Sequence, residues 1–129
     1  MAERYVVTIV TDGSGDGTGY TPVVSGEVIQ VRYVKTDYTN GVGFTITAEA
    51  TGETIWAEAA VDASATRAPR QAVHSTAGVA ALYAAGGTAV SDRIVLAQDR
   101  IKIVVASGGA AHTGTFHVLM SGPVTGRSG

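Results

Sequence analysis

The chain has 129 residues, of which 45% are hydrophobic and only 16% are charged. This length suits one domain, which on folding buries roughly 65% of the surface that its unfolded chain exposes. Nine Lys and Arg residues against eleven Asp and Glu give a net charge of −2. The basic residues are scattered, so we expect no nucleic-acid partner, because phosphate binding needs a concentrated basic patch. The absence of cysteine excludes disulfides, thiolate zinc sites and cysteine nucleophiles.

The low fraction of charged residues predicts an unusual surface. Typical soluble domains carry roughly 25% charged residues, so this chain is expected to have an uncharged exterior, as in a subunit that packs against others. The first residues, Met-Ala-Glu-Arg-Tyr, form no apolar signal core, and no stretch approaches the ~20 apolar residues that cross a bilayer. We therefore expect synthesis in a cytoplasm and no membrane partner.

The first predicted strand covers residues 4–10, which are almost all β-branched or aromatic. Tyr5, Val7 and Ile9 share one face, and the opposite face is also apolar, so the strand is expected to be covered on both sides. Four glycines then alternate within residues 12–19. This pattern predicts a turn or a flexible loop and excludes a strand interior.

The next segments predict a meander of three strands. Residues 27–35 alternate most cleanly between apolar and polar. The pair Asn40-Gly41 is typical of a type I′ hairpin turn, so residues 44–50 are expected to pair back on 27–35. A second tight turn leads into a third strand at 54–61, which would complete the meander.

The middle of the chain gives a weaker pattern. Residues 62–75 lose the alternation and contain Pro69, which predicts a long surface loop. The alanine-rich segment 77–85 contains Gly78 and leaves a short helix, a single helical turn or a strand open.

The last third predicts two further strand regions. Residues 94–97 and 100–106 are expected to form a hairpin around Gln98-Asp99, and 115–120 forms the final strand. We therefore predict a single all-β domain over residues 1–129, an antiparallel β-sandwich or a jelly-roll-like barrel with long glycine-rich loops. Residues 1–4 and 121–129 are expected to be flexible or extended arms.

Candidate chemistry is sparse. Residues 12–17 resemble the first half of a calcium loop, but the acid expected at the twelfth position is Val23 and the flanking segments are strands. A solvated turn is the preferred reading. The outward-facing carboxylates Glu49, Glu53 and Glu58 could form a glycosidase pair, although solubilising residues on strands are far more common.

The histidines also give no convincing site. None of His74, His112 and His117 has the i, i+3 or i+4 spacing of a metal-binding pair on a helix. Ser75 beside His74, with Asp62 upstream, could be imagined as a hydrolase set, but no Gly-x-Ser-x-Gly elbow is present. We expect no catalytic residue, no cofactor, no metal site and no enzymatic activity.

One resemblance covers nearly the whole chain. It rests on the general character of five segments, which are residues 4–10 (Arg-Tyr-Val-Val-Thr-Ile-Val), 20–33, 44–52, 99–109 and 114–120. In this respect the chain resembles the head decoration, or cement, proteins of tailed bacteriophages. The resemblance implies a non-catalytic all-β homotrimer on the outer capsid surface of the virion, where it clamps neighbouring major capsid protein subunits.

Two alternatives stay open. The chain could be a tail or head-tail joining protein of the same kind of virus, or a carbohydrate-binding β-sandwich module with an aromatic platform of Trp56 and either Tyr38 or Tyr20. For a protein interface, we expect contributions from Tyr5, Val7, Tyr38 and Trp56. Trp56 suits a core position equally well, because a sandwich can bury either face of a strand.

Overall fold

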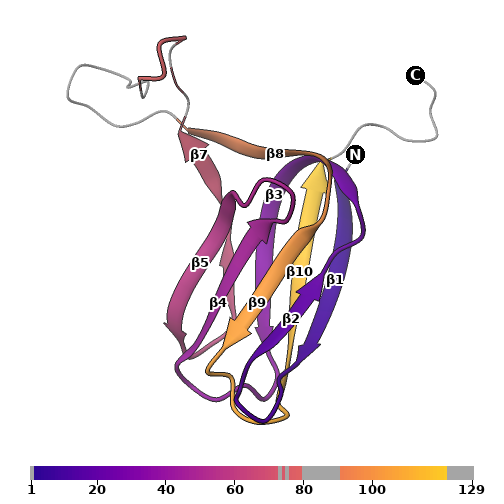
Figure 1. Cartoon of the computed structure of the whole chain (residues 1–129), viewed down its shortest axis with the longest axis vertical. Helices are drawn as coiled ribbons and strands as arrows, with labels where there is room; N and C mark the ends of the chain where they lie inside the picture. Colours follow the sequence, from indigo (N-terminus) through magenta and orange to yellow (C-terminus); the bar gives the residue numbers. More distant parts are fainter. Residues whose placement is uncertain (1, 73, 75, 80–90, 122–129) are drawn as a thin grey trace.

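The fold is a β-sandwich, seen in a computed structural model that describes residues 2–72, 74, 76–79 and 91–121 (Figure 1). Two antiparallel sheets pack face to face, which confirms the predicted all-β sandwich. Among the described residues there is no helix long and apolar enough to cross a bilayer.

The two sheets are called sheet I and sheet II. Sheet I has six strands, in the order β1 (Ala2–Val10), β10 (Thr113–Ser121), β3 (Val24–Lys35), β8 (Ser91–Asp99) and β7 (Arg70–Ala72), with β6 (Ala65–Arg67) also paired to β3. Sheet II has four strands, in the order β2 (Gly17–Tyr20), β9 (Ile101–Ala106), β4 (Val42–Ala48) and β5 (Thr54–Val61).

The core lies between the sheets and follows the period-two alternation of the strands. In β4, β9 and β10 every second side chain is buried, because successive side chains of a strand point to opposite faces. The centre of the core is an aromatic cluster to which both sheets contribute: Tyr33, Phe44, Trp56 and Phe116, with Tyr38 beside them.

The predicted meander is wrong in its first half. Strands β4 and β5 form the expected hairpin, but β3 belongs to sheet I and β4 to sheet II. The reason is Tyr38, which is only 2% exposed and whose hydroxyl donates a hydrogen bond to the Ile9 carbonyl, 2.7 Å away. The segment that crosses from one sheet to the other is therefore anchored by this buried tyrosine. Gly41 has a φ of 88°, whereas Asn40 has no positive φ, so the type I′ turn is absent.

The predicted hairpin around Gln98-Asp99 is wrong for a related reason. Strand β8 pairs with β3 in sheet I, whereas β9 pairs with β2 and β4 in sheet II. Gln98 has a φ of 49°, and the chain changes sheets directly after Asp99. The alternation identified both strands but not the sheets to which they belong.

The glycine-rich segment after β1 is partly a strand. Residues 12–16 form the expected turn, with the Asp12 N–H bonded to the Asp16 carbonyl at 2.8 Å. Residues 17–20 nevertheless form β2, which contradicts the prediction of a loop. A Cβ at Gly17 would lie 2.6 Å from Ile9 Cγ2. Glycine is needed there because β1 and β2 approach too closely for any side chain.

Three other predicted segments also differ. Short strands β6 and β7 lie on either side of Pro69, where a continuous loop was expected. Residues 2–4, expected to be an arm, lie in β1 and pair with 119–121, so Ser121 also belongs to the sheet. Of the segment 77–85, the part from residue 80 onward lies outside the described residues, as do residues 122–129.

The close approach of β1 and β2 gives a test of the packing. A Cβ at Gly19 would lie 2.8 Å from both Ile9 Cγ1 and Val7 Cγ1. Gly19→Ala should therefore lower the free energy of unfolding by about 1–3 kcal/mol, because two stiff β-branched side chains must move. Urea unfolding measures this. Gly13→Ala is the control: nothing lies within 4 Å of its Cβ, so its effect should stay below about 0.5 kcal/mol.

Candidate interaction surfaces

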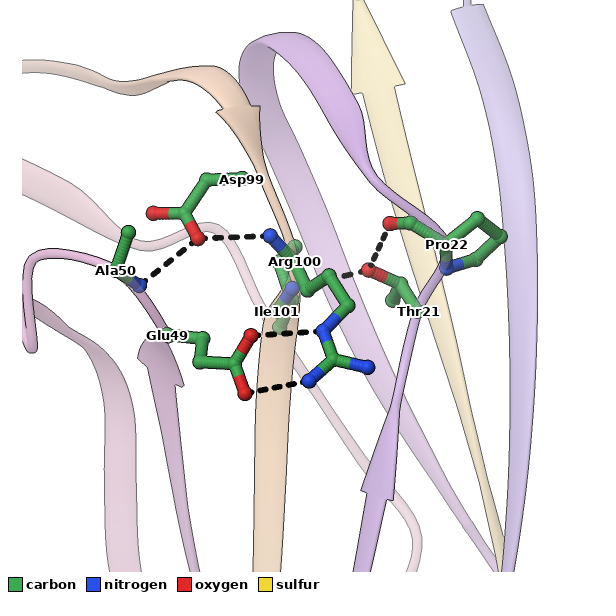
Figure 2. A network of polar contacts seen from close by, with 7 residues as sticks. All are labelled: Thr21, Pro22, Glu49, Ala50, Asp99, Arg100 and Ile101. Atoms are coloured by element: carbon green, nitrogen blue, oxygen red, sulfur yellow. Dashed lines mark hydrogen bonds and ion pairs between the residues drawn. The ribbon is translucent and has the colours of Figure 1, made fainter.

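A polar corner joins four segments at one end of the sandwich (Figure 2). Arg100, between β8 and β9, donates from Nε and Nη2 to the two carboxylate oxygens of Glu49, at 2.7 and 2.6 Å. Its Cζ also lies 4.1 Å from the ring centroid of Tyr20. The hydrogen bonds from Arg100 lower the pKa of Glu49 from its usual 4.5. The guanidinium is thus held by a carboxylate and an aromatic ring of its own chain.

Asp99 fixes the backbone of the same corner. Its side chain is buried, and Oδ1 accepts hydrogen bonds from the N–H groups of Ala50, at 2.9 Å, and Arg100, at 2.8 Å. Thr21, directly after β2, is also buried, and its Oγ1 accepts a hydrogen bond from the Ile101 N–H at 3.0 Å. These side chains satisfy backbone groups where regular pairing stops, which is a structural use of polar residues.

A second polar cluster, which we call the Glu58 clasp, joins the two sheets at the β5 edge. The Glu58 carboxylate accepts hydrogen bonds from Trp56 Nε1 at 2.9 Å and from Arg67 Nε and Nη2 at 3.1 and 2.9 Å. Arg67 also lies over the Trp56 ring, with Cζ 5.6 Å from its centroid. The hydrogen bonds from Arg67 and then Trp56 lower the pKa of Glu58. Glu58, a candidate acid, is therefore ionised and bound within the chain.

The outer face of sheet II contains a shallow groove with a volume of about 370 Å³. It lies over β4, β5 and β9. Its outward-facing lining is small and uncharged: Gly43, Thr45, Ala57, Ala59, Val104 and Ala106. Phe44, which is only 3% exposed, and Glu58 complete the lining. No titratable nucleophile lines it. Such a groove can accept an apolar side chain or an extended backbone from another protein.

The groove residues were not predicted from the sequence, although their pattern along the strands gives a signal. Gly43 and Thr45 on β4, and Ala57 and Ala59 on β5, are small residues at alternate, outward positions of adjacent strands. A pattern of outward alanines and glycines is typical of a strand surface that another layer covers, since exposed strands usually carry longer polar side chains.

The outer face of sheet I has a different character. Val6 and Val10 of β1 are 55% and 61% exposed. Beside them, His117 pairs with Val6 and with Arg32 in the two ladders that flank β10, and Arg4 Nη1 lies 3.2 Å from His117 Nδ1. Three basic side chains are too few for strong phosphate binding.

The expected interface residues are mostly in the core. Val7, Tyr38 and Trp56 are 7%, 2% and 7% exposed, so they pack against their own chain and present little surface to a partner. Burial is the main cause that raises the pKa of Tyr38 to about 12. Tyr5 is half-buried, and its hydroxyl donates to Glu3 at 3.0 Å. Of the four, Tyr5 alone retains substantial exposed surface.

Trp56 points inward because β5 carries a β-bulge. In the ladder with β4, Ile46 pairs with Trp56 and Thr47 with Thr54, so Ile55 is an extra residue. Ile55 and Trp56 are consequently both buried. A strict alternation had placed these two residues on opposite faces, and the bulge is why it fails here.

The turn at residues 12–16, which resembles half of a calcium loop, forms hydrogen bonds within itself. Asp12 Oδ1 accepts the N–H groups of Ser14 and Asp16 at 2.8 and 3.1 Å, so this carboxylate caps its own turn. These bonds lower the pKa of Asp12. Within residues 2–72, 74, 76–79 and 91–121, no group of three or more His, Asp or Glu side chains could hold a metal ion.

Comparisons with protein-family models, with curated proteins and with solved structures found no match.

Asp99 provides a test of the polar corner. Asp99→Ala leaves the Ala50 and Arg100 N–H groups without their acceptor, so we expect the free energy of unfolding to fall by about 1–3 kcal/mol. Asp99→Asn keeps an oxygen at the Oδ1 position and should retain most of the stability. Chemical denaturation measures both, and equal losses in the two variants would contradict the role given to Oδ1.

Trp56 is the single tryptophan of the chain, so its fluorescence should follow the ionisation of Glu58. Because folding lowers the pKa of Glu58, its stabilising contribution is present above the usual pKa of 4.5 and is lost as the pH falls through the lowered value. We expect a fluorescence transition with a midpoint below 4.5. Arg67→Gln should move that midpoint upward, whereas Arg93→Gln, which removes a distant ion pair with Glu27, should not.

Proposed function

We propose that this chain is a structural virion protein that decorates the outside of a tailed-phage capsid and binds neighbouring subunits of the major capsid protein. The observation that carries the proposal is the outer face of sheet II, with its groove of small side chains and a single carboxylate, Glu58. A surface of this kind loses little hydration on burial and can pack closely against another protein. The general resemblance of the sequence to decoration proteins supports the same conclusion.

The polar groups of the described residues are also consistent with a binding role. Glu49 and Glu58 are held by arginines, Asp99 caps the backbone, and Asp12 caps its own turn. Each of these carboxylates is used to hold the fold. The proposed activity therefore depends on shape and burial and needs no reacting group.

Binding of this kind stabilises an assembled shell by mass action. A protein whose site spans two neighbouring subunits binds the lattice and not the free subunit. It then contributes about 2.7 kcal/mol per site when its concentration exceeds the Kd a hundredfold. Many sites on one shell reinforce one another, so modest affinity at each site suffices.

The carbohydrate-binding alternative loses its platform, since Trp56 and Tyr38 are buried. Tyr20 is 40% exposed, but Arg100 covers one face of its ring. The tail or head-tail joining alternative uses the same fold. It differs in location, because a joining protein would bind at a single vertex or along the tail.

The proposal predicts that a reading frame beside the gene of this chain encodes a major capsid protein, and co-expression of the two proteins tests it. We expect the chain to sediment with assembled shells, in many copies per shell, and not with free capsid subunits. Ala57→Lys, which places a charge in the groove, should weaken shell binding at least tenfold, about 1.4 kcal/mol. Val95→Lys is the control, because Val95 is 58% exposed on sheet I.

Three results would each count against the proposal. Binding to free capsid subunits would exclude the lattice-specific mechanism. A few copies confined to tails or to one vertex would favour the joining protein. Equal binding by the Ala57→Lys and Val95→Lys variants would exclude the groove as the contact.

A further inference from the structure

We propose that the open edge of β1 pairs antiparallel with β1 of a second copy, so that two protomers share one continuous sheet I. Strand β1 pairs with β10 on one side over its full length, from Ala2 opposite Ser121 to Val10 opposite Thr113, without a bulge. No described strand pairs with its other side. An edge of this length and regularity is a template for another strand.

The ladder itself determines which backbone groups are open. The Thr11 N–H donates to the His112 carbonyl, directly beyond the last pair of β1 and β10. Since backbone groups alternate in direction along a strand, Ile9, Val7 and Tyr5 also direct theirs toward β10. The N–H and C=O groups of Arg4, Val6 and Thr8 therefore point to the open side. These are the groups that a second strand would satisfy.

The other edges that the structure describes are poorly suited to pairing. Strand β8 is covered by β7 only at residues 91–93, and its open part is bulged against β3 and has Gln98 at a φ of 49°. Strands β6 and β7 have three residues each and flank Pro69. Strand β5 is bulged twice against β4, with Ala60 at a φ of 57°, and β2 has four residues, two of them glycine. Bulges, short lengths and proline are the usual means by which proteins block an edge. Strand β1 has none of them.

The occupant that fits this edge is a second copy, because β1 is complementary to itself. The antiparallel register with the largest overlap places Val6 opposite Val6 of the partner subunit. Arg4 then faces the partner's Thr8, so the arginines do not meet. On the inner side, the half-buried Tyr5 comes opposite the partner's Val7 in a non-hydrogen-bonded pair, where side chains lie closest. Such a contact has two-fold symmetry and closes at two subunits.

This inference is independent of what the groove on sheet II binds. It differs from the homotrimer that the sequence resemblance implies, because a trimer requires two different surfaces in each contact. Sedimentation separates the two: at micromolar concentration we expect a species of twice the 13.1 kDa chain mass. A monomer or a trimer under these conditions would overturn the two-fold pair.

The register is tested with a single thiol, which is informative because the chain has no cysteine. Val6→Cys places two thiols opposite each other across the two-fold axis. The Cα atoms of a hydrogen-bonded pair are about 5.5 Å apart, within the range that a disulfide needs. We expect nearly complete covalent dimer after mild oxidation, and recovery of the monomer with a reductant.

Val10→Cys is the matched control, since Val10 lies on the same face of β1 and is similarly exposed. The two copies of residue 10 would lie about 26 Å apart, eight steps of roughly 3.3 Å, so little covalent dimer should form. Equal linkage of the two cysteine variants, or none with Val6→Cys, would overturn the register.

A second variant tests the backbone pairing without a thiol. Thr8→Pro removes an N–H that points to the open side, so the ladder with β10 keeps its bonds and the chain should fold. We expect this variant to be monomeric, with circular dichroism like that of the parent, whereas Thr8→Val keeps the N–H and should remain dimeric. A folded Thr8→Pro variant that is still dimeric would overturn the proposal.

Discussion

The structure depends on the contact between five aromatic rings that lie between its two sheets. Tyr33 of sheet I lies 5.1 Å from Phe44 of sheet II, measured between ring centroids, and Phe44 lies 4.6 Å from Trp56 and 5.1 Å from Phe116. Each such pair is worth about 0.5–1.5 kcal/mol beyond its burial. Tyr38 stacks near Tyr33 and ties the crossing segment to Ile9. The cluster sets how the sheets lie on each other, and therefore which faces and edges are left for other proteins.

The polar residues support this arrangement from its rim. The Arg100 corner holds β2, β9 and the β4–β5 turn together (Figure 2). The Glu58 clasp connects β5 with β6. Because these ion pairs are exposed or half-exposed, each contributes little to the free energy of unfolding. Their importance is geometric. The corner fixes the end of sheet II at Ile101, and Glu58 also lines the groove on the outer face.

The strands could be predicted from the sequence, but their partners could not. The alternation is strict in residues 101–106, where burial follows the sequence directly. In residues 27–35 it holds only in part, because a β-bulge at Ile29 buries Val28 and Val31. Pairing between strands depends on where the intervening segment goes, and one buried side chain, Tyr38, redirects the chain to the other sheet. For the same reason Gly19 read as a loop residue: its role is defined by Ile9, which lies on another strand. The groove is a property of three strands side by side and became visible only with the ladder register.

The pairing of β1 with β10 has a consequence for how the protein is made. Tyr5 faces Val118, so the first described strand finds its sheet partner in the last. Tyr5 precedes Val118 by 113 residues, so during synthesis at about 5–20 residues per second β1 has no β10 to pair with until that stretch has been made. Sheet I cannot close before that moment, so the domain completes its folding only after most of it has been translated. Until then both edges of β1 are unpaired, and either can pair with a strand of another nascent chain.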